Sequence, residues 1–100
     1  MYSHYEYKVP KEYVRYAIAN KWSYDPHKYD FVSTLAHEFK GENEVLGFSA
    51  LKDAIHFNDK ETALKVFANQ PAWVHEKCEV IAFEKRYGLC YLIRGGKIDE

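Results

Sequence analysis

The chain has 100 residues, of which 47% are hydrophobic and 17% aromatic, enough to build one hydrophobic core but not two. Its 14 Lys and Arg residues and 15 Asp and Glu residues give a formal net charge of −1, and the two signs are interspersed. Binding to many phosphates needs a clustered cationic surface, so this pattern argues against non-specific nucleic-acid binding. We expect one globular domain over residues 1–100, with an α+β fold in which a small antiparallel sheet, including a C-terminal β-hairpin, packs against two to three helices.

Neither a membrane span nor a signal peptide is visible. No stretch approaches the roughly 20 apolar residues that cross a bilayer. The N-terminus is rich in tyrosine, whereas a signal peptide would have a cationic end and then an apolar run. We therefore expect a cytoplasmic protein with no membrane partner.

The first third of the chain predicts one short extended segment and two helices. Residues 2–8 alternate in part, as in a strand or an ordered arm. Pro10 suits the first turn of a helix, and the apolar residues after it repeat at intervals of three and four, which predicts a helix over 11–21. The Asp-Pro pair at 25–26 is typical of a helix start, and a second helix is expected over about 26–40.

The middle of the chain contains one ambiguous segment and one clear helix. A strand is expected near 44–48, whereas residues 50–57 fit either a helix or a strand. Asn58 and Glu61 have the spacing of a capping box, in which each side chain bonds a free N–H of the first turn. A helix is therefore expected over 59–69, ended by the proline that follows.

The last third predicts a β-hairpin. The apolar runs VIAF at 80–83 and LCYLI at 89–93 are rich in strand-forming residues, and turn-forming residues 84–88 separate them. Runs that are apolar at every position indicate strands covered on both faces, at least in part.

The two cysteines are expected to be reduced. With pairing centred near Arg86, Cys90 would lie opposite residue 82 or 83, and Cys78 would lie further along the hairpin. Four strand residues would separate the sulfur atoms by about 13 Å, beyond the reach of a disulfide.

No pattern of residues predicts a metal, a cofactor or a catalytic centre. The five histidines lack the spacings of zinc ligands, and the nearest candidate pair, His75 and Cys78, would need two more ligands. The scattered glycines form no phosphate-binding loop. Cys90 lies in an apolar strand, which disfavours the reactive thiolate. We therefore expect no metal and no cofactor, and an enzyme is the least favoured class.

Tyrosine is the unusual feature of the sequence. Seven of the nine tyrosines precede residue 30, more than a small core can bury with their hydroxyls hydrogen-bonded. Exposed tyrosine offers a large contact area at a low cost in rotamer entropy. The sequence therefore predicts a protein-binding face near the N-terminus, formed by Tyr2, Tyr5, Tyr7, Tyr16, Trp22 and Tyr24.

These features favour a small non-catalytic protein-interaction module that acts stoichiometrically, as an inhibitor or regulator of a larger protein. The partner is expected to be another protein, and a homodimer is one form this could take. The alternative is a nucleic-acid-associated accessory protein that stacks bases on the same aromatic rings and uses nearby Lys and Arg. Interspersed acidic residues weaken that alternative.

Overall fold

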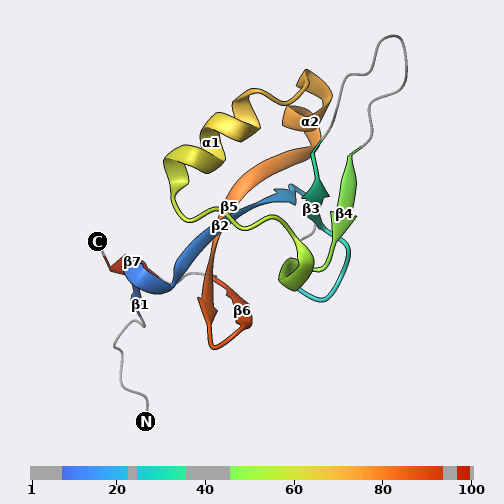
Figure 1. Cartoon of the computed structure of the whole chain (residues 1–100). Coiled ribbons are helices and arrows are strands. Elements are labelled where there is room, and N and C mark those ends of the chain that lie inside the picture. Colours follow the sequence, from blue (N-terminus) through green and yellow to red (C-terminus); the bar gives the residue numbers. More distant parts are fainter. Residues whose placement is uncertain (1–7, 23–24, 36–45, 94–96, 100) are drawn as a thin grey trace.

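A five-stranded antiparallel sheet and two helices make up most of the structure (Figure 1). It is a computed structural model that describes residues 8–22, 25–35, 46–93 and 97–99. The strand order is β4-β3-β2-β5-β6, so the expected α+β architecture with an antiparallel sheet is confirmed. The strands of this sheet are β2 (Val14–Asn20), β3 (Phe31–Thr34), β4 (Gly47–Ser49), β5 (Cys78–Arg86) and β6 (Leu89–Leu92), and the helices are α1 (Lys60–Ala68) and α2 (Ala72–Lys77).

Shorter elements connect and flank this sheet. Strand β1 (Lys8–Pro10) pairs in parallel with β7 (Lys97–Asp99) as a separate two-stranded sheet. The 3-10 helix η1 (Lys11–Tyr13) leads from β1 into β2, and η2 (Leu51–Asp53) follows β4. No helix among the described residues is long and apolar enough to cross a membrane.

Strands β2 and β5 form the centre of the sheet. They pair over seven residues, from Val14 opposite Glu84 to Asn20 opposite Cys78. Successive residues of a strand point to opposite faces, and Ala17, Ile18 and Ala19 of β2 are all at most 1% exposed. The central strand is therefore covered on both faces.

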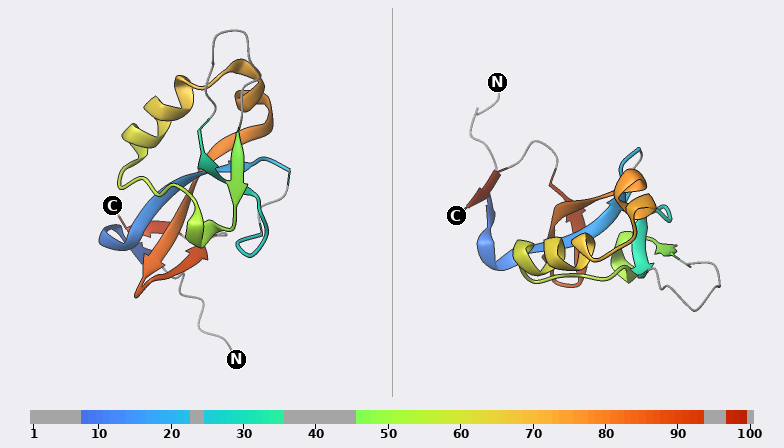
Figure 2. Two further views of the ribbon diagram at one scale, coloured as in Figure 1. Left: turned by 45° about the vertical axis from the view of Figure 1, so that its right-hand side comes forward. Right: turned by 90° about the horizontal axis from the view of Figure 1, so that it is seen from above.

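Helices α1 and α2 cover one face of the sheet, the helix face (Figure 2). Ile18, Val32 and Cys78 from three strands form a buried cluster there with Val74 of α2. Phe67 of α1 packs against the same cluster. Burial of these side chains, each about 1.5–3 kcal/mol for a large aliphatic or aromatic group, holds the helices in place.

The opposite face, the cleft face, has a second cluster built around Phe31 and Phe83. No α-helix of the described part of the chain covers it. Leu51 of η2 is fully buried against this cluster, and Ala54 packs beside it. Among the described residues its cover is thus one short helical turn and the segment after it.

The expected C-terminal hairpin is confirmed, with a shorter turn than expected. Tyr87 and Gly88 have φ angles of 53° and 78°, as in a type I′ turn, whose twist matches that of the flanking strands. Cover of both strand faces was expected at least in part, by helices or by the N-terminal residues, of which 1–7 lie outside the described residues; within the described residues Leu89 and Tyr91 of β6 are 57% and 52% exposed. The helices end before they reach this edge of the sheet (Figure 1).

An ion pair within β5 lies next to the hairpin turn. The Nε of Arg86 lies 2.9 Å from a carboxylate oxygen of buried Glu84. The guanidinium of Arg86 also stacks 3.9 Å from the ring centre of Tyr13 in η1, a favourable cation–π geometry. These contacts fix the hairpin relative to the start of β2.

The helix expected over 11–21 is wrong. Residues 11–13 form η1, and Val14–Asn20 form β2. A helix would have left Ala19 off its apolar stripe, whereas as a central strand this run buries Ala17, Ile18 and Ala19 together. The frequent apolar residues of this run fit the periodicity of a helix as well as that of a strand. Long-range pairing with β3 and β5 therefore decides between the two.

The helix expected over 26–40 is wrong in its described part, and residues 36–40 lie outside the described residues. Residues 26–30 form turns and Phe31–Thr34 form β3. The carboxylate of Asp25 accepts a hydrogen bond from the N–H of His27 at 2.9 Å, so it closes a local turn in place of a helix cap.

The remaining expectations are met to different degrees. Strand β4 overlaps the strand expected over 44–48, of which 44–45 lie outside the described residues. The ambiguous segment 50–57 contains η2 and then extended chain, ending in a bridge between Phe57 and Tyr16. Of the arm expected over 2–8, only Lys8 is described, at the start of β1.

The helix expected over 59–69 is confirmed as α1, but its cap differs from the expected one. Asp59, not Asn58, is the N-cap: its carboxylate accepts hydrogen bonds from the N–H and the hydroxyl of Thr62, at 2.7 and 2.9 Å. These bonds stabilise the ionised form and lower the pKa of Asp59 below the ordinary aspartate value.

We expect the Asp59→Ala variant to lower the melting temperature, because it leaves N–H groups of the first turn of α1 without a partner. The matched Asn58→Ala variant should melt close to the wild type. The Asp59 contribution is present above the pKa of the unfolded chain and lost as the pH falls through the lowered pKa of the folded state. Thermal denaturation at neutral and acidic pH measures both effects. Equal losses in the two variants would contradict the assigned cap.

Candidate functional site

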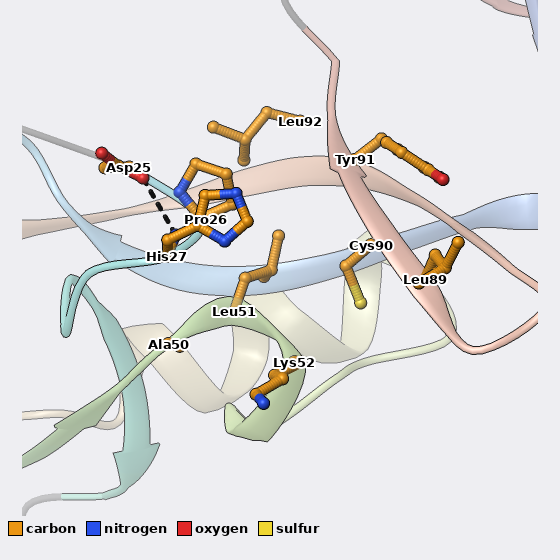
Figure 3. A pocket seen from close by; sticks show the side chains of 10 residues that line it. All are labelled: Asp25, Pro26, His27, Ala50, Leu51, Lys52, Leu89, Cys90, Tyr91 and Leu92. Carbon is orange, nitrogen blue, oxygen red and sulfur yellow. Dashed lines mark hydrogen bonds between the residues drawn. The ribbon is translucent and has the colours of Figure 1, made fainter.

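A cleft of about 820 Å³ opens beside β6 (Figure 3). It is lined by all four residues of β6, by Ala50–Lys52 and by Asp25–His27. Its size lies within the roughly 300–1,000 Å³ of ligand-binding sites, which are typically apolar with a few polar groups. The cleft therefore has the size and character of a binding site.

Hydrogen bonds join the two segments of the wall opposite β6. The N–H of Leu51 donates to the carbonyl of Pro26 at 3.1 Å. Asp30 accepts from the N–H of Asp25 at 3.2 Å, which closes the turn on which Pro26 lies. The wall is thus a single connected unit.

His56 makes two hydrogen-bond contacts and one ring contact close to η2. Its Nε2 lies 2.7 Å from the carbonyl oxygen of Leu51, and its Nδ1 lies 3.3 Å from the Nζ of Lys85. A neutral imidazole meets both contacts when Nε2 donates to the carbonyl and Nδ1 accepts from the ammonium. The ring also packs edge-on against Phe83, with 4.8 Å between ring centres. His56 therefore connects η2 to β5.

Charge in the cleft is carried by Asp25 and Lys52. The carboxylate of Asp25 is engaged with the N–H of His27. Lys52 is exposed, and no ion pair or hydrogen bond of its ammonium is found among residues 8–22, 25–35, 46–93 and 97–99. The ammonium of Lys52 is therefore available to a bound group.

Cys90 contributes a thiol to the cleft wall. Burial raises its pKa above the ordinary value, an effect that nearby Lys85 opposes in part. The pKa of Cys78, which is fully buried in the helix face, is also raised by burial. Both residues are free thiols, as expected, and at neutral pH the protonated form is favoured.

The expected spacing of the cysteines requires a correction. Cys90 lies opposite Lys85, not residue 82 or 83, because the turn falls at residues 87–88. Cys78 is seven residues before Lys85 on β5, about 23 Å along the strand. The sulfur atoms are therefore further apart than the sequence indicated.

Most of the large hydrophobic side chains exposed among the described residues lie on two segments that also contribute residues to the cleft. Of the six large hydrophobic residues exposed among the described residues, five lie on the connection between β2 and β3 or on the β5–β6 hairpin. The sixth, Leu64 on α1, belongs to the helix face. The five are Trp22 at 83%, Tyr29 at 77%, Tyr87 at 92%, Leu89 at 57% and Tyr91 at 52% exposure.

Two of the residues expected at a protein-binding face are described. Trp22 is largely exposed. Tyr16 is half-buried in β2, and its backbone exchanges hydrogen bonds with Phe57 at 2.8 and 2.9 Å. The other four, Tyr2, Tyr5, Tyr7 and Tyr24, lie outside the described residues.

Several cleft residues were not anticipated from the sequence. Leu89 and Tyr91 alternate with Cys90 along β6, and this period of two could have placed them on a common face. No sequence pattern indicated that Lys52 would lie in the cleft, because its position depends on how η2 packs against the sheet. The exposure of Tyr87 follows from the turn, once its two residues are known.

The histidine and cysteine considered as metal ligands are separated by their environments. The Nε2 of His75 is 2.6 Å from the carbonyl oxygen of Phe67, and Cys78 is in the helix-face core. Within the described ranges no three His, Cys, Asp or Glu side chains converge on a common point.

Comparison with protein-family models, with curated proteins and with solved structures gave no match.

We expect Cys90 to be alkylated well before Cys78 in the folded protein, because only Cys90 borders the cleft. Since burial raises the pKa of Cys90, its reaction with iodoacetamide should be slower at pH 8 than that of an unfolded control, and should accelerate as the pH rises through that pKa. Peptide mass spectrometry after timed quenching identifies the modified residue. Simultaneous labelling of both thiols would contradict the structure.

Proposed function

We propose that the chain is a non-catalytic protein-interaction module that binds its partner through the cleft beside β6 and the exposed apolar residues around it. The observation that carries this proposal is the concentration of five of the six exposed large hydrophobic residues of the described chain on two elements that line the cleft. Leu89 and Tyr91, both more than half exposed, line the cleft directly, and exposed apolar side chains beside a pocket are typical of interaction sites. The inhibitor or regulator role is part of this proposal.

The chemistry of these side chains suits protein binding. Tyr and Trp offer rigid, amphipathic surfaces and are enriched among residues that dominate binding energy. Trp22 and Tyr29 lie on the same β2–β3 connection as the cleft-lining Asp25–His27, and Tyr91 lines the cleft from β6. A partner bound in the cleft could contact Tyr91 directly.

The backbone at Tyr87 supports the same proposal. Its φ of 53° is in the left-handed region, which Asn and Gly adopt far more readily than a bulky residue. Tyr87 is 92% exposed, so no packing within the described structure compensates for this conformation. Strain of this kind concentrates at functional positions.

The described titratable groups do not favour catalysis. A backbone carbonyl engages the Nε2 of both His56 and His75, and the raised pKa of Cys90 makes it a poor nucleophile at neutral pH. These observations support a binding role over an enzymatic one.

The paired change Tyr29→Ser and Tyr91→Ser tests the proposal. An affinity-tagged chain should capture a protein partner from lysate in the presence of nuclease, and the double variant should bind that purified partner at least about 2 kcal/mol more weakly if either ring is an anchor. Leu64→Ser is the matched control: it removes an exposed apolar group from α1 and should leave affinity unchanged. Capture that nuclease abolishes would instead support the nucleic-acid alternative.

We expect Tyr87→Asn to increase stability and weaken partner binding together. Asparagine tolerates a positive φ, so the free energy of unfolding should rise by about 1 kcal/mol, while the lost ring removes a binding contact. Chemical denaturation and calorimetric titration of the purified partner measure the two changes. A stabilised variant with undiminished affinity would remove Tyr87 from the binding surface.

A further inference from the structure

Strand β6 is an edge strand with a free side. Within the described part of the chain it pairs only with β5. The hairpin turn consists of Tyr87 and Gly88, with Arg86 opposite Leu89. In a two-residue hairpin, the residues that flank the turn exchange both backbone hydrogen bonds.

Hydrogen-bonded and non-hydrogen-bonded residue pairs alternate along two antiparallel strands. This alternation determines which backbone groups of β6 point toward β5 and which point away. Leu89 and Tyr91 direct their N–H and C=O groups toward β5, because every second pair is hydrogen-bonded. Cys90 and Leu92 direct theirs away from β5, to the free edge. The edge therefore offers two N–H donors and two C=O acceptors.

The cleft runs along this edge. It is lined by all four residues of β6, whose side chains alternate between the two faces of the sheet. Cys90 and Leu92 pack on the same core as Leu51 and so face the cleft. Leu89 and Tyr91 belong to the opposite face and also line the cleft, so the cleft reaches the edge of the strand, beside which a further strand would lie.

The opposite wall limits what can occupy this space. The Ala50–Lys52 segment and the Asp25–His27 loop stand across the cleft from β6 (Figure 3), and a hydrogen bond between Leu51 and Pro26 joins them. Edge pairing with β6 of a second copy would extend that copy's whole sheet through this wall. A single extended segment has no such conflict.

The lining indicates the chemistry of the segment. Leu51, Cys90 and Leu92 present apolar groups on the cleft face, where they pack on the core around Phe83. Because strand side chains alternate, every second residue of the added segment would meet this surface. The ammonium of Lys52, which has no partner among the described residues, complements an acidic side chain.

We propose that the cleft takes one extended segment of a partner protein as a sixth strand beside β6. The segment has apolar residues at alternate positions, bonds the backbone of Cys90 and Leu92, and carries an acidic residue near Lys52. This mode of recognition draws affinity from main-chain hydrogen bonds and specificity from alternate side chains. The inference rests on the proposed function as a protein-interaction module.

The primary test uses a panel of labelled synthetic peptides. Each has valine, leucine or phenylalanine at alternate positions, threonine between them and one aspartate, and fluorescence anisotropy measures binding to the full chain. At least one peptide should bind below about 1 mM, and hydrogen exchange should slow at the amides of Cys90 and Leu92. Failure of the whole panel at that concentration would overturn the proposal.

Backbone variants separate strand addition from side-chain contacts. Cys90→Pro removes a free-edge N–H, and proline is tolerated where an edge N–H points away from the sheet. Cys90→Ala is the matched control, which removes the thiol and keeps the N–H. We expect the proline variant to bind at least about tenfold more weakly than the alanine variant. N-methylation of the peptide should weaken binding to wild-type protein, a readout independent of whether the proline variant folds.

Charge exchange tests the proposed ion pair. Lys52→Glu should weaken binding of the aspartate peptide and strengthen binding of its lysine counterpart. Equal affinity of wild type and Lys52→Glu for both peptides would remove the acidic residue from the proposal. Binding that is insensitive to both Cys90→Pro and N-methylation would overturn strand addition, as would a dimer on sedimentation with no peptide binding.

These experiments distinguish failure of strand addition from failure of the proposed interaction function. If Tyr29→Ser with Tyr91→Ser abolishes binding of the purified partner while Cys90→Pro preserves it, strand addition fails and the interaction function stands. If both variants bind as the wild type does, both proposals fail.

Discussion

The pairing of β2 with β5 is the interaction on which the rest of the structure depends. Seven consecutive residue pairs join strands that begin more than 60 positions apart in the chain, and both faces of this pair are buried. Even-numbered residues such as Ile18 hold the two helices, and odd-numbered residues such as Ala17 and Phe83 form the core beneath the cleft. A shift of one residue would exchange these faces, so the register determines which side carries helices and which remains open.

The two faces of the sheet are covered unequally, and this explains why β6 has exposed apolar side chains. The helix face is covered by α1 and α2, whereas in the described part of the chain the cleft face has only Leu51 and the segment that follows it as cover. The helices do not reach β6 (Figure 1), which leaves Leu89 and Tyr91 exposed and one edge of the strand without a partner in the described structure. A protein must normally protect such an edge from unspecific pairing, and here the segment around Leu51 stands across the cleft from β6.

Local hydrogen bonds keep this arrangement rigid. His56 connects Leu51 to Lys85, Arg86 connects Glu84 to Tyr13, and the Pro26 carbonyl holds the Leu51 N–H. The bonds of His56 and Pro26 join elements that do not pair as strands, whereas the ion pair of Glu84 and Arg86 lies within β5. The Leu51–Pro26 bond lies in the cleft wall itself, and preformed sites avoid the ordering cost that flexible ones incur on binding.

Local signals in the sequence were enough to determine helix α1 and the C-terminal hairpin, because side-chain capping, a following proline and strand-forming runs around a turn act within a few residues. Strands β2 and β3 were expected to be helical, since apolar residues at almost every position of 14–20 satisfy both periods. The predicted face of N-terminal aromatic residues stays a prediction, and of the candidate cleft sequence reasoning anticipated none of Lys52, Leu89 and Tyr91. Their meeting depends on which strands pair and how the sheet curls, and those contacts between distant residues are decided only by the tertiary structure.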